Sequence, residues 1–143
     1  FQEGILVAET IAGLNPRPIN YDGVPRVTYS EPEVASMGLT TKVAKERGYD
    51  VVELDYNLAG NGKAQILKTA GSIKLVAQKN GPILGIHMVG SRVGELVSEA
   101  QLIFNWEASA SDVAPLIHAH PTLSESMGEA HMALAGKPLH AHG

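Results

Sequence analysis

The chain has 143 residues, with 15 acidic and 11 basic side chains and a formal net charge of −4. This length suits one domain with a substantial core, and 44% hydrophobic against 18% charged residues excludes a disordered chain. The chain has no cysteine, which excludes a disulfide scaffold and a cysteine-ligated zinc site. The mild acidity without a basic run argues against a nucleic-acid partner, and no apolar run is long enough to cross a membrane. The absence of cysteine fits a reducing, cytoplasmic location.

The first eighteen residues are predicted to be the end of a helix followed by a linker. Residues 1–13 place apolar side chains at helical spacing, and Gly13 can end the helix. Two prolines in residues 14–18 favour an extended linker. Because the chain opens inside a helical pattern without a capping residue, we expect it to be a piece of a longer protein. The main domain is expected to span residues 19–143.

The main domain is predicted to begin with strands and to end with helices. A strand over 24–29 precedes a helix that starts at the capping box Ser30-Glu-Pro-Glu33 and stops at Gly38. Asn80-Gly81, between two later strands, is a strong hairpin signal. The full set is strands over 24–29, 49–56, 72–79 and 83–89, and helices over 30–38, 40–47, 63–67, 93–106, 109–116 and 122–135. This order predicts an α+β fold, an antiparallel sheet with helices layered on it.

Histidines gather near the C-terminus, and the sharpest cluster is the run His118-Ala-His120-Pro-Thr-Leu-Ser-Glu125. His120 lies just before a predicted helix, and Glu125 lies in the first turn of that helix. A carboxylate in this place can hold the proton-bearing nitrogen of the imidazole and fix its tautomer. His120 and Glu125 are therefore a candidate acid/base pair. The His120–Pro121 bond is the best candidate for a cis peptide.

Two other interpretations of this cluster remain open. Thr122-Leu-Ser-Glu125 is also a capping box, so Glu125 could serve only the helix start in a purely structural module. His118, His120 and Glu125 also match the two-histidine, one-glutamate spacing of cupin metal sites. That motif lies on strands of an all-β barrel, whereas Glu125 opens a helical stretch, so we expect no metal site. We expect no function for the His140-Ala-His142 tail.

The cluster closely resembles the C-terminal signature of the dihydrolipoamide dehydrogenases, in the pyridine nucleotide-disulfide oxidoreductase family. The run from Val24 to Thr40 resembles the entry into that family's interface, or dimerisation, domain. Gly85-Ile-His-Met-Val-Gly90, with Glu95 and Glu99 after it, resembles the central hairpin and helix of that domain. Residues 1–13 resemble the helix that ends the flavin-binding region. The resemblance thus covers nearly the whole chain.

The resemblance implies a part in an enzyme that reoxidises protein-bound dihydrolipoamide with FAD and NAD. In that pattern His120 is the base, Glu125 orients it, and the pair reaches across a two-fold interface to the other subunit's cysteines. His120 and Pro121 are the implied flavin contacts, and His118 has no implied catalytic role. The implied partners are a second copy of the chain and the lipoyl domain of a 2-oxo acid dehydrogenase complex. The dinucleotide-binding domains and redox cysteines are missing here, so the chain alone is expected to bind neither cofactor and to be inactive.

Overall fold

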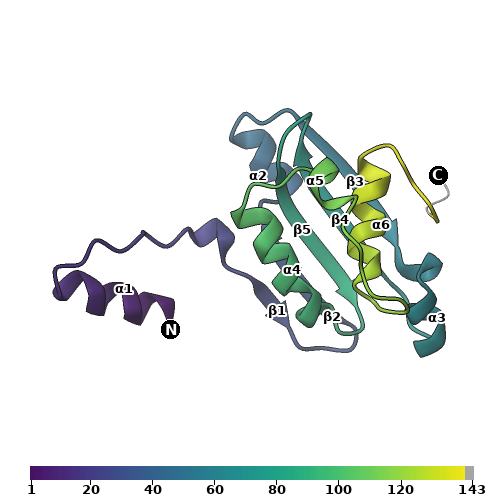
Figure 1. The fold of residues 1–143 in the computed structure, drawn as a ribbon, viewed down its shortest axis with the longest axis horizontal. Helices are drawn as coiled ribbons and strands as arrows, with labels where there is room; N and C mark the ends of the chain where they lie inside the picture. Colours follow the sequence, from purple (N-terminus) through teal and green to yellow (C-terminus); the bar gives the residue numbers. More distant parts are fainter. Residues whose placement is uncertain (141–143) are drawn as a thin grey trace.

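Five antiparallel strands form one sheet in the order β1-β2-β5-β4-β3 in a computed structural model, which describes residues 1–140 (Figure 1). The strands are β1 Arg26–Thr28, β2 Glu33–Gly38, β3 Val51–Asn57, β4 Gly71–Gln78 and β5 Ile83–Gly90. The helices are α1 Gln2–Ile11, α2 Thr41–Glu46, α3 Gly62–Leu67, α4 Val93–Asn105, α5 Ala110–Val113 and α6 Glu125–Leu134, with short turns of 3₁₀ helix at Tyr21–Gly23 and Leu58–Gly60. The structure confirms the α+β fold with helices layered on an antiparallel sheet.

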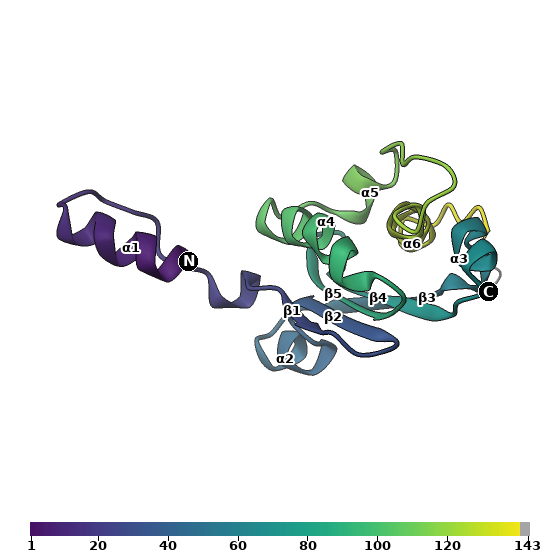
Figure 2. The same ribbon diagram turned by 90° about the horizontal axis from the view of Figure 1, so that it is seen from below.

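The helices cover the two faces of the sheet unequally. Figure 2 shows α4, α5 and α6 on one face and α2 on the other. The main core lies between the sheet and the larger helical layer, because alternate side chains of each strand point to that side. Its fully buried members include Ile73, Leu75, Ile86, Met88 and Met127. This packing seats α6, which begins at Glu125, against β3 and β4.

Residues 1–20 stand apart from the sheet (Figure 1). Helix α1 has no buried residue, and the chain after it runs on without helix or strand as far as Tyr21. The Tyr21 hydroxyl donates a hydrogen bond to the Glu3 carboxylate over 2.9 Å. The helix and the extended linker confirm the predicted local structure, and the domain boundary at residue 19 stays a prediction.

Most elements form where local patterns predict them. Asn80 has a positive φ of 57° in the hairpin between β4 and β5, as the Asn-Gly signal indicates. Helix α4 forms within the predicted range 93–106, and it buries Val93, Val97 and Ala100 against the sheet. Helix α6 begins at Glu125 and not at Thr122, so it is three residues shorter at its start than predicted. Among residues 1–140, no helix is long and apolar enough to cross a membrane.

The predicted helix over 30–38 is wrong, because residues 33–38 form strand β2. This strand pairs with β1 on one side and β5 on the other, so its backbone donors and acceptors are used by two neighbours. Ala35 and Met37 are buried while Val34 is exposed, which is the two-residue period of a strand. The Glu33 carboxylate does not cap its own segment: it accepts a hydrogen bond from the Gly94 backbone N–H at the start of α4, over 2.8 Å.

Candidate active site

His120 lies on the loop between α5 and α6, and its imidazole projects from the surface with 77% of the side chain exposed. The Nδ1 atom lies 2.9 Å from Glu125 Oε1. An ionised carboxylate only accepts hydrogen bonds, so the neutral ring carries its proton on Nδ1. Nε2 is then left as an unprotonated acceptor, which is the state that a general base requires. The His120–Pro121 peptide bond is cis, as predicted.

Glu125 serves the imidazole and the helix start at the same time. Its Oε1 pairs with His120, and its Oε2 accepts the Thr122 backbone N–H over 2.9 Å. In return, the Glu125 N–H donates to Thr122 Oγ1 over 3.3 Å, which completes a capping box. Partial burial opposes ionisation, but the bonds from Thr122 and His120 prevail and hold the pKa of Glu125 below its ordinary value. The structure therefore unites the capping and orienting roles in one carboxylate.

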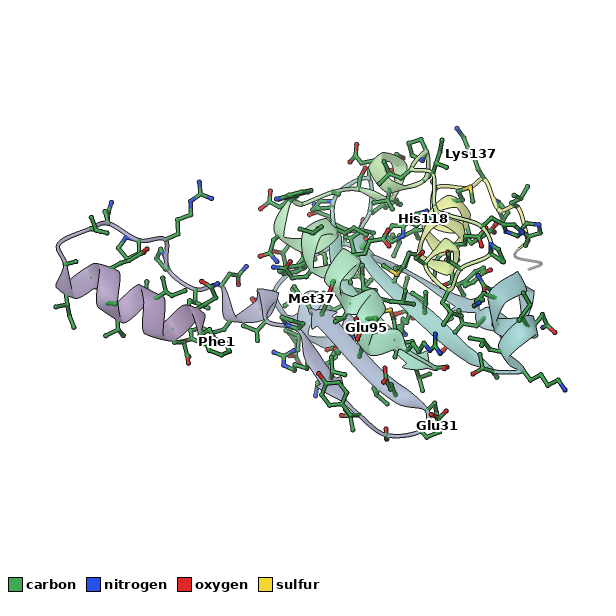
Figure 3. The ribbon with its side chains drawn as sticks, turned by 60° about the horizontal axis from the view of Figure 1, so that its bottom comes forward. Phe1, Glu31, Met37, Glu95, His118 and Lys137 are labelled. Carbon is green, nitrogen blue, oxygen red and sulfur yellow. The ribbon has the colours of Figure 1, made fainter. Side chains whose placement is uncertain are left out.

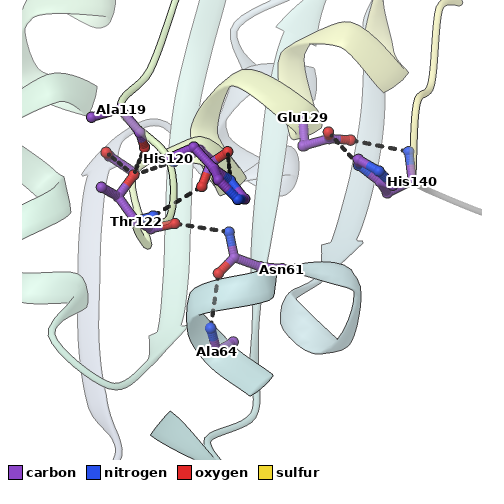
Figure 4. A network of polar contacts seen from close by, with 9 residues as sticks. Asn61, Ala64, Ala119, His120, Thr122, Glu129 and His140 are labelled. Carbon is purple, nitrogen blue, oxygen red and sulfur yellow. Dashed lines mark hydrogen bonds and ion pairs between the residues drawn. The ribbon is translucent and has the colours of Figure 1, made fainter. Parts of the chain in front are cut away.

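Hydrogen bonds hold both the side chain and the backbone carbonyl of Thr122. Its Oγ1 donates to the Ala119 carbonyl over 2.6 Å, which closes the turn that carries His120. Its carbonyl accepts a hydrogen bond from Asn61 Nδ2 over 3.0 Å, while Asn61 Oδ1 accepts from the Ala64 N–H over 2.9 Å (Figure 4). Sequence reasoning missed Asn61, whose only local signal is its place as a helix-capping residue before α3.

His118 turns away from His120 and into the protein. Figure 3 shows it between α4 and α6, where its Nε2 lies 2.7 Å from Glu99 Oε1. Its ring also lies against Gly128 of α6, where a Cβ atom would come within 2.8 Å of His118 Nδ1. His118 and His120 thus pair with different carboxylates, and within residues 1–140 no three metal-binding side chains are placed to hold an ion. With a sheet-and-helix fold in place of a barrel, the metal-site interpretation is not favoured.

A second imidazole–carboxylate pair stands one turn along α6. Glu129 Oε1 lies 2.8 Å from His140 Nδ1, and Glu129 Oε2 accepts the His140 backbone N–H over 3.2 Å (Figure 4). Both pairs line a cavity of about 200 Å³ that also contacts the Tyr56 hydroxyl. Burial, with Glu129 and Glu125 nearby, raises the pKa of Tyr56 to about 12. The sequence places Glu125 and Glu129 four residues apart, hence on one helix side, but gave no sign of Tyr56 or His140.

His87 on β5 lies outside this cavity. It sits between Ser36 Oγ, 2.7 Å from Nδ1, and the Leu39 carbonyl, 3.0 Å from Nε2. Burial lowers the pKa of His87, and both ring nitrogens are engaged by the protein. In the tail, for which we expect no function, His140 pairs with Glu129. His142 lies outside the described residues.

Pro121 lines a second, open hollow beside the site. This hollow has a volume of about 380 Å³ and includes Leu96, Leu123, Lys63 and Arg92. The surface that this hollow exposes is mainly apolar.

Comparison with known proteins identifies the family of the chain. Residues 24–131 match the family model described as the pyridine nucleotide-disulphide oxidoreductase dimerisation domain. The chain belongs to this family. This dimerisation domain is 43% identical over 140 residues to a dihydrolipoyl dehydrogenase of Bacillus subtilis, covering 96% of the chain and 30% of that relative. It is 40% identical to dihydrolipoyl dehydrogenase 2, mitochondrial, of Arabidopsis thaliana, covering 97% of the chain and 28% of the relative.

Solved structures show the same fold for the dimerisation domain. LpdA from Mycobacterium tuberculosis superposes with a TM-score of 0.86 at 21% identity, over 93% of this chain and 29% of that one. The flavoprotein disulfide reductase RclA from Escherichia coli superposes with a TM-score of 0.77 at 22% identity, over 87% of this chain and 29% of that one. The dimerisation domain therefore spans less than a third of the length of these relatives.

Proposed function

We propose that this chain is the C-terminal dimerisation domain of a dihydrolipoyl dehydrogenase and supplies its acid/base pair. Residues 19–143 would form that domain, and residues 1–18 the end of a flavin-domain helix and its linker. The observation that carries the proposal is that the two carboxylate oxygens of Glu125 have different partners. One oxygen fixes the His120 tautomer, the other holds the loop to α6, and Nε2 is left free to accept a proton.

The chemistry begins with a thiol of dihydrolipoamide, because only the thiolate is an effective nucleophile toward a disulfide. His120 Nε2 takes the thiol proton, and the resulting imidazolium is stabilised by the Glu125 carboxylate. The thiolate then attacks a disulfide elsewhere in the enzyme, since this chain has no cysteine; the S–S bond breaks, a mixed disulfide forms and one cysteine thiolate leaves. The second thiol of dihydrolipoamide, once deprotonated, breaks the mixed disulfide and gives lipoamide and a reduced pair of cysteines, a dithiol. When bound, FAD would supply the two-electron acceptor between that dithiol and NAD. His120 and Pro121 would contact the flavin of the partner subunit along the apolar hollow.

Exposed apolar side chains beside the site support a homodimer. Leu116 and Ile117, just before His118, are 58% and 100% exposed. Large apolar side chains in water are costly and mark contact surfaces, and two-fold contacts are the commonest in homo-oligomers. A second copy covering this surface would shield His120 and bring it to the other subunit's reacting groups. The lipoyl domain of a 2-oxo acid dehydrogenase complex would be the second partner. The cytoplasmic location stays a prediction, since one relative is named mitochondrial.

The test is His120→Gln in the full-length enzyme. Loss of a general base typically costs roughly 10²–10⁴-fold, so dihydrolipoamide oxidation should collapse. NADH-driven reduction of an artificial acceptor needs flavin but no dithiol base, so it should persist and serves as the control. If both activities survive, the histidine is structural and the chain is a dimerisation module only.

A further inference from the structure

The site loop rests on a segment far away in the sequence. Asn61 and Thr122 are 61 positions apart, yet the Asn61 amide donates to the Thr122 carbonyl over 3.0 Å. Asn61 is 4% exposed, so its amide is shielded from water, while Thr122 at the other end of the bond is half-buried. A buried amide that loses its partner pays a desolvation cost, which makes such a bond a firm anchor.

Asn61 is held at both ends of its side chain. Its Oδ1 accepts the Ala64 N–H over 2.9 Å and so caps α3, while its Nδ2 reaches the loop. The Asn61 amide therefore links the start of α3 to the Thr122 carbonyl. The N–H of Thr122 is in turn accepted by Glu125. Its orientation is set by this pair of bonds, because only the oxygen can accept and only the nitrogen can donate.

The start of α3 also lies near the imidazole. Gly62 has no side chain, and a Cβ atom built on it would lie 3.9 Å from His120 Cε1. Asn61, Gly62, His120 and Glu125 all line the same cavity. The site loop thus lies beside the start of α3 near the ring, and Asn61 supplies the hydrogen bond between them.

We propose that Asn61 is a positioning residue for His120, and that its amide donor sets the place of the site loop against α3. This inference rests on the proposed function, because it assigns Asn61 a role in that same proton transfer. Reacting groups displaced by about 1 Å can lose on the order of 10²-fold in rate. Asn61 touches no reacting atom and acts through Thr122 alone.

The test uses Asn61→Asp in the full-length enzyme. Aspartate keeps the acceptor that caps α3 but removes the donor to the Thr122 carbonyl and sets a negative oxygen against it. We expect kcat for dihydrolipoamide to fall roughly 10- to 100-fold with little change in KM. The solvent deuterium isotope effect on kcat should rise, because proton transfer to a displaced ring becomes slower.

Asn57→Asp is the matched control. Asn57 caps the neighbouring 3₁₀ turn by accepting the Ala59 N–H over 2.8 Å, and no hydrogen bond joins its side chain to the site loop. It should keep wild-type kcat and isotope effect. Asn61→Ser retains a capping oxygen but is too short to reach Thr122, so it should behave like Asn61→Asp. If the aspartate variant does not fold, the serine variant provides the test.

The outcomes separate this inference from the proposed function. If His120→Gln abolishes dihydrolipoamide turnover but Asn61→Asp and Asn61→Ser match Asn57→Asp, Asn61 only caps α3 and the inference is overturned. If His120→Gln leaves turnover intact, the proposed function itself fails. NADH-driven reduction of an artificial acceptor should be unchanged in Asn57→Asp, and its measurement in each of the other variants reports whether flavin binding is intact.

Discussion

His118 and His120 stand two residues apart on one loop, each with a glutamate partner, yet the protein places them in opposite settings. The His118 side chain is 13% exposed and lies between α4 and α6, whereas the His120 side chain is 77% exposed. The distances to their carboxylates are nearly the same, 2.7 Å and 2.9 Å. The difference teaches that burial, not the pairing itself, separates a packing histidine from a candidate base. Removing one partner of a buried pair is costly because the other is left unpaired, whereas removing one partner of an exposed pair costs little.

His131 extends the comparison to a buried histidine without a carboxylate, and it carries the largest expected effect on stability. It is fully buried, its Nδ1 lies 2.6 Å from the Met127 carbonyl, and Nε2 has no hydrogen-bond partner within residues 1–140. Burial lowers the pKa of His131 from 6.5 to about 4. The unfolded chain gains the proton first, so stability present above pH 6.5 is lost as the pH falls towards 4.

The size of this loss is about 3 kcal/mol in the free energy of unfolding. Urea unfolding of the chain at about pH 7.5 and about pH 4.5 measures most of it. His131→Gln should remove this part of the pH dependence, while His120→Gln should keep it. An unchanged pH dependence in His131→Gln would contradict the assignment.

His118→Phe should produce the next largest effect. Phenylalanine keeps a ring against Gly128 but leaves Glu99 without its partner, which should lower the free energy of unfolding by about 2 kcal/mol. His120→Gln, at an exposed position, should change it by less than about 0.5 kcal/mol. Denaturant unfolding of the two variants measures both values, and equal losses would break the distinction between the pairs.

A double-mutant cycle measures the interaction energy between His118 and Glu99. Combining His118→Phe with Glu99→Gln should cost less than the sum of the single changes, because both remove one interaction. The coupling energy isolates the pair from the packing of the ring. Strict additivity would show that His118 acts by packing alone.

Glu125→Gln should have a smaller effect on stability than His118→Phe, and it separates the two roles of this carboxylate. Glutamine has one acceptor oxygen in place of two. If this oxygen accepts the Thr122 N–H, the amide NH2 can only donate to His120 Nδ1, which moves the ring proton to Nε2 and removes the free acceptor there. We expect a loss of about 1 kcal/mol in unfolding free energy, similar to that of Thr122→Val, which removes the other half of the capping box. Glu125→Gln should lower dihydrolipoamide turnover in the full-length enzyme much more than Thr122→Val, because Thr122→Val leaves the carboxylate on His120 Nδ1. Equal turnover in both variants would mean that Glu125 is a cap alone.

Local signals predicted much of the fold and the central pair of the site. The hairpin at Asn80-Gly81, the apolar face of α4 and the pairing of His120 with Glu125 each depend on residues close in sequence. The capping box at Ser30 failed because the same residues also suit a strand, and pairing with β1 and β5 outweighs a local motif. Asn61 was missed because nothing nearby in sequence indicates what its amide nitrogen contacts.

The sequence by itself determined the order of most elements, the cis candidate at His120–Pro121 and the carboxylate five residues beyond the imidazole. These features follow from interactions within a turn or two of the chain, which act before any long-range contact forms. Only the tertiary structure decided that His118 faces Glu99, 19 positions away, and that Asn61 holds Thr122, 61 positions away. It also decided that Tyr56, Glu129 and His140 share a cavity with the dyad. Such contacts depend on how α3, α4 and α6 pack against one sheet, and no short stretch of sequence encodes that packing.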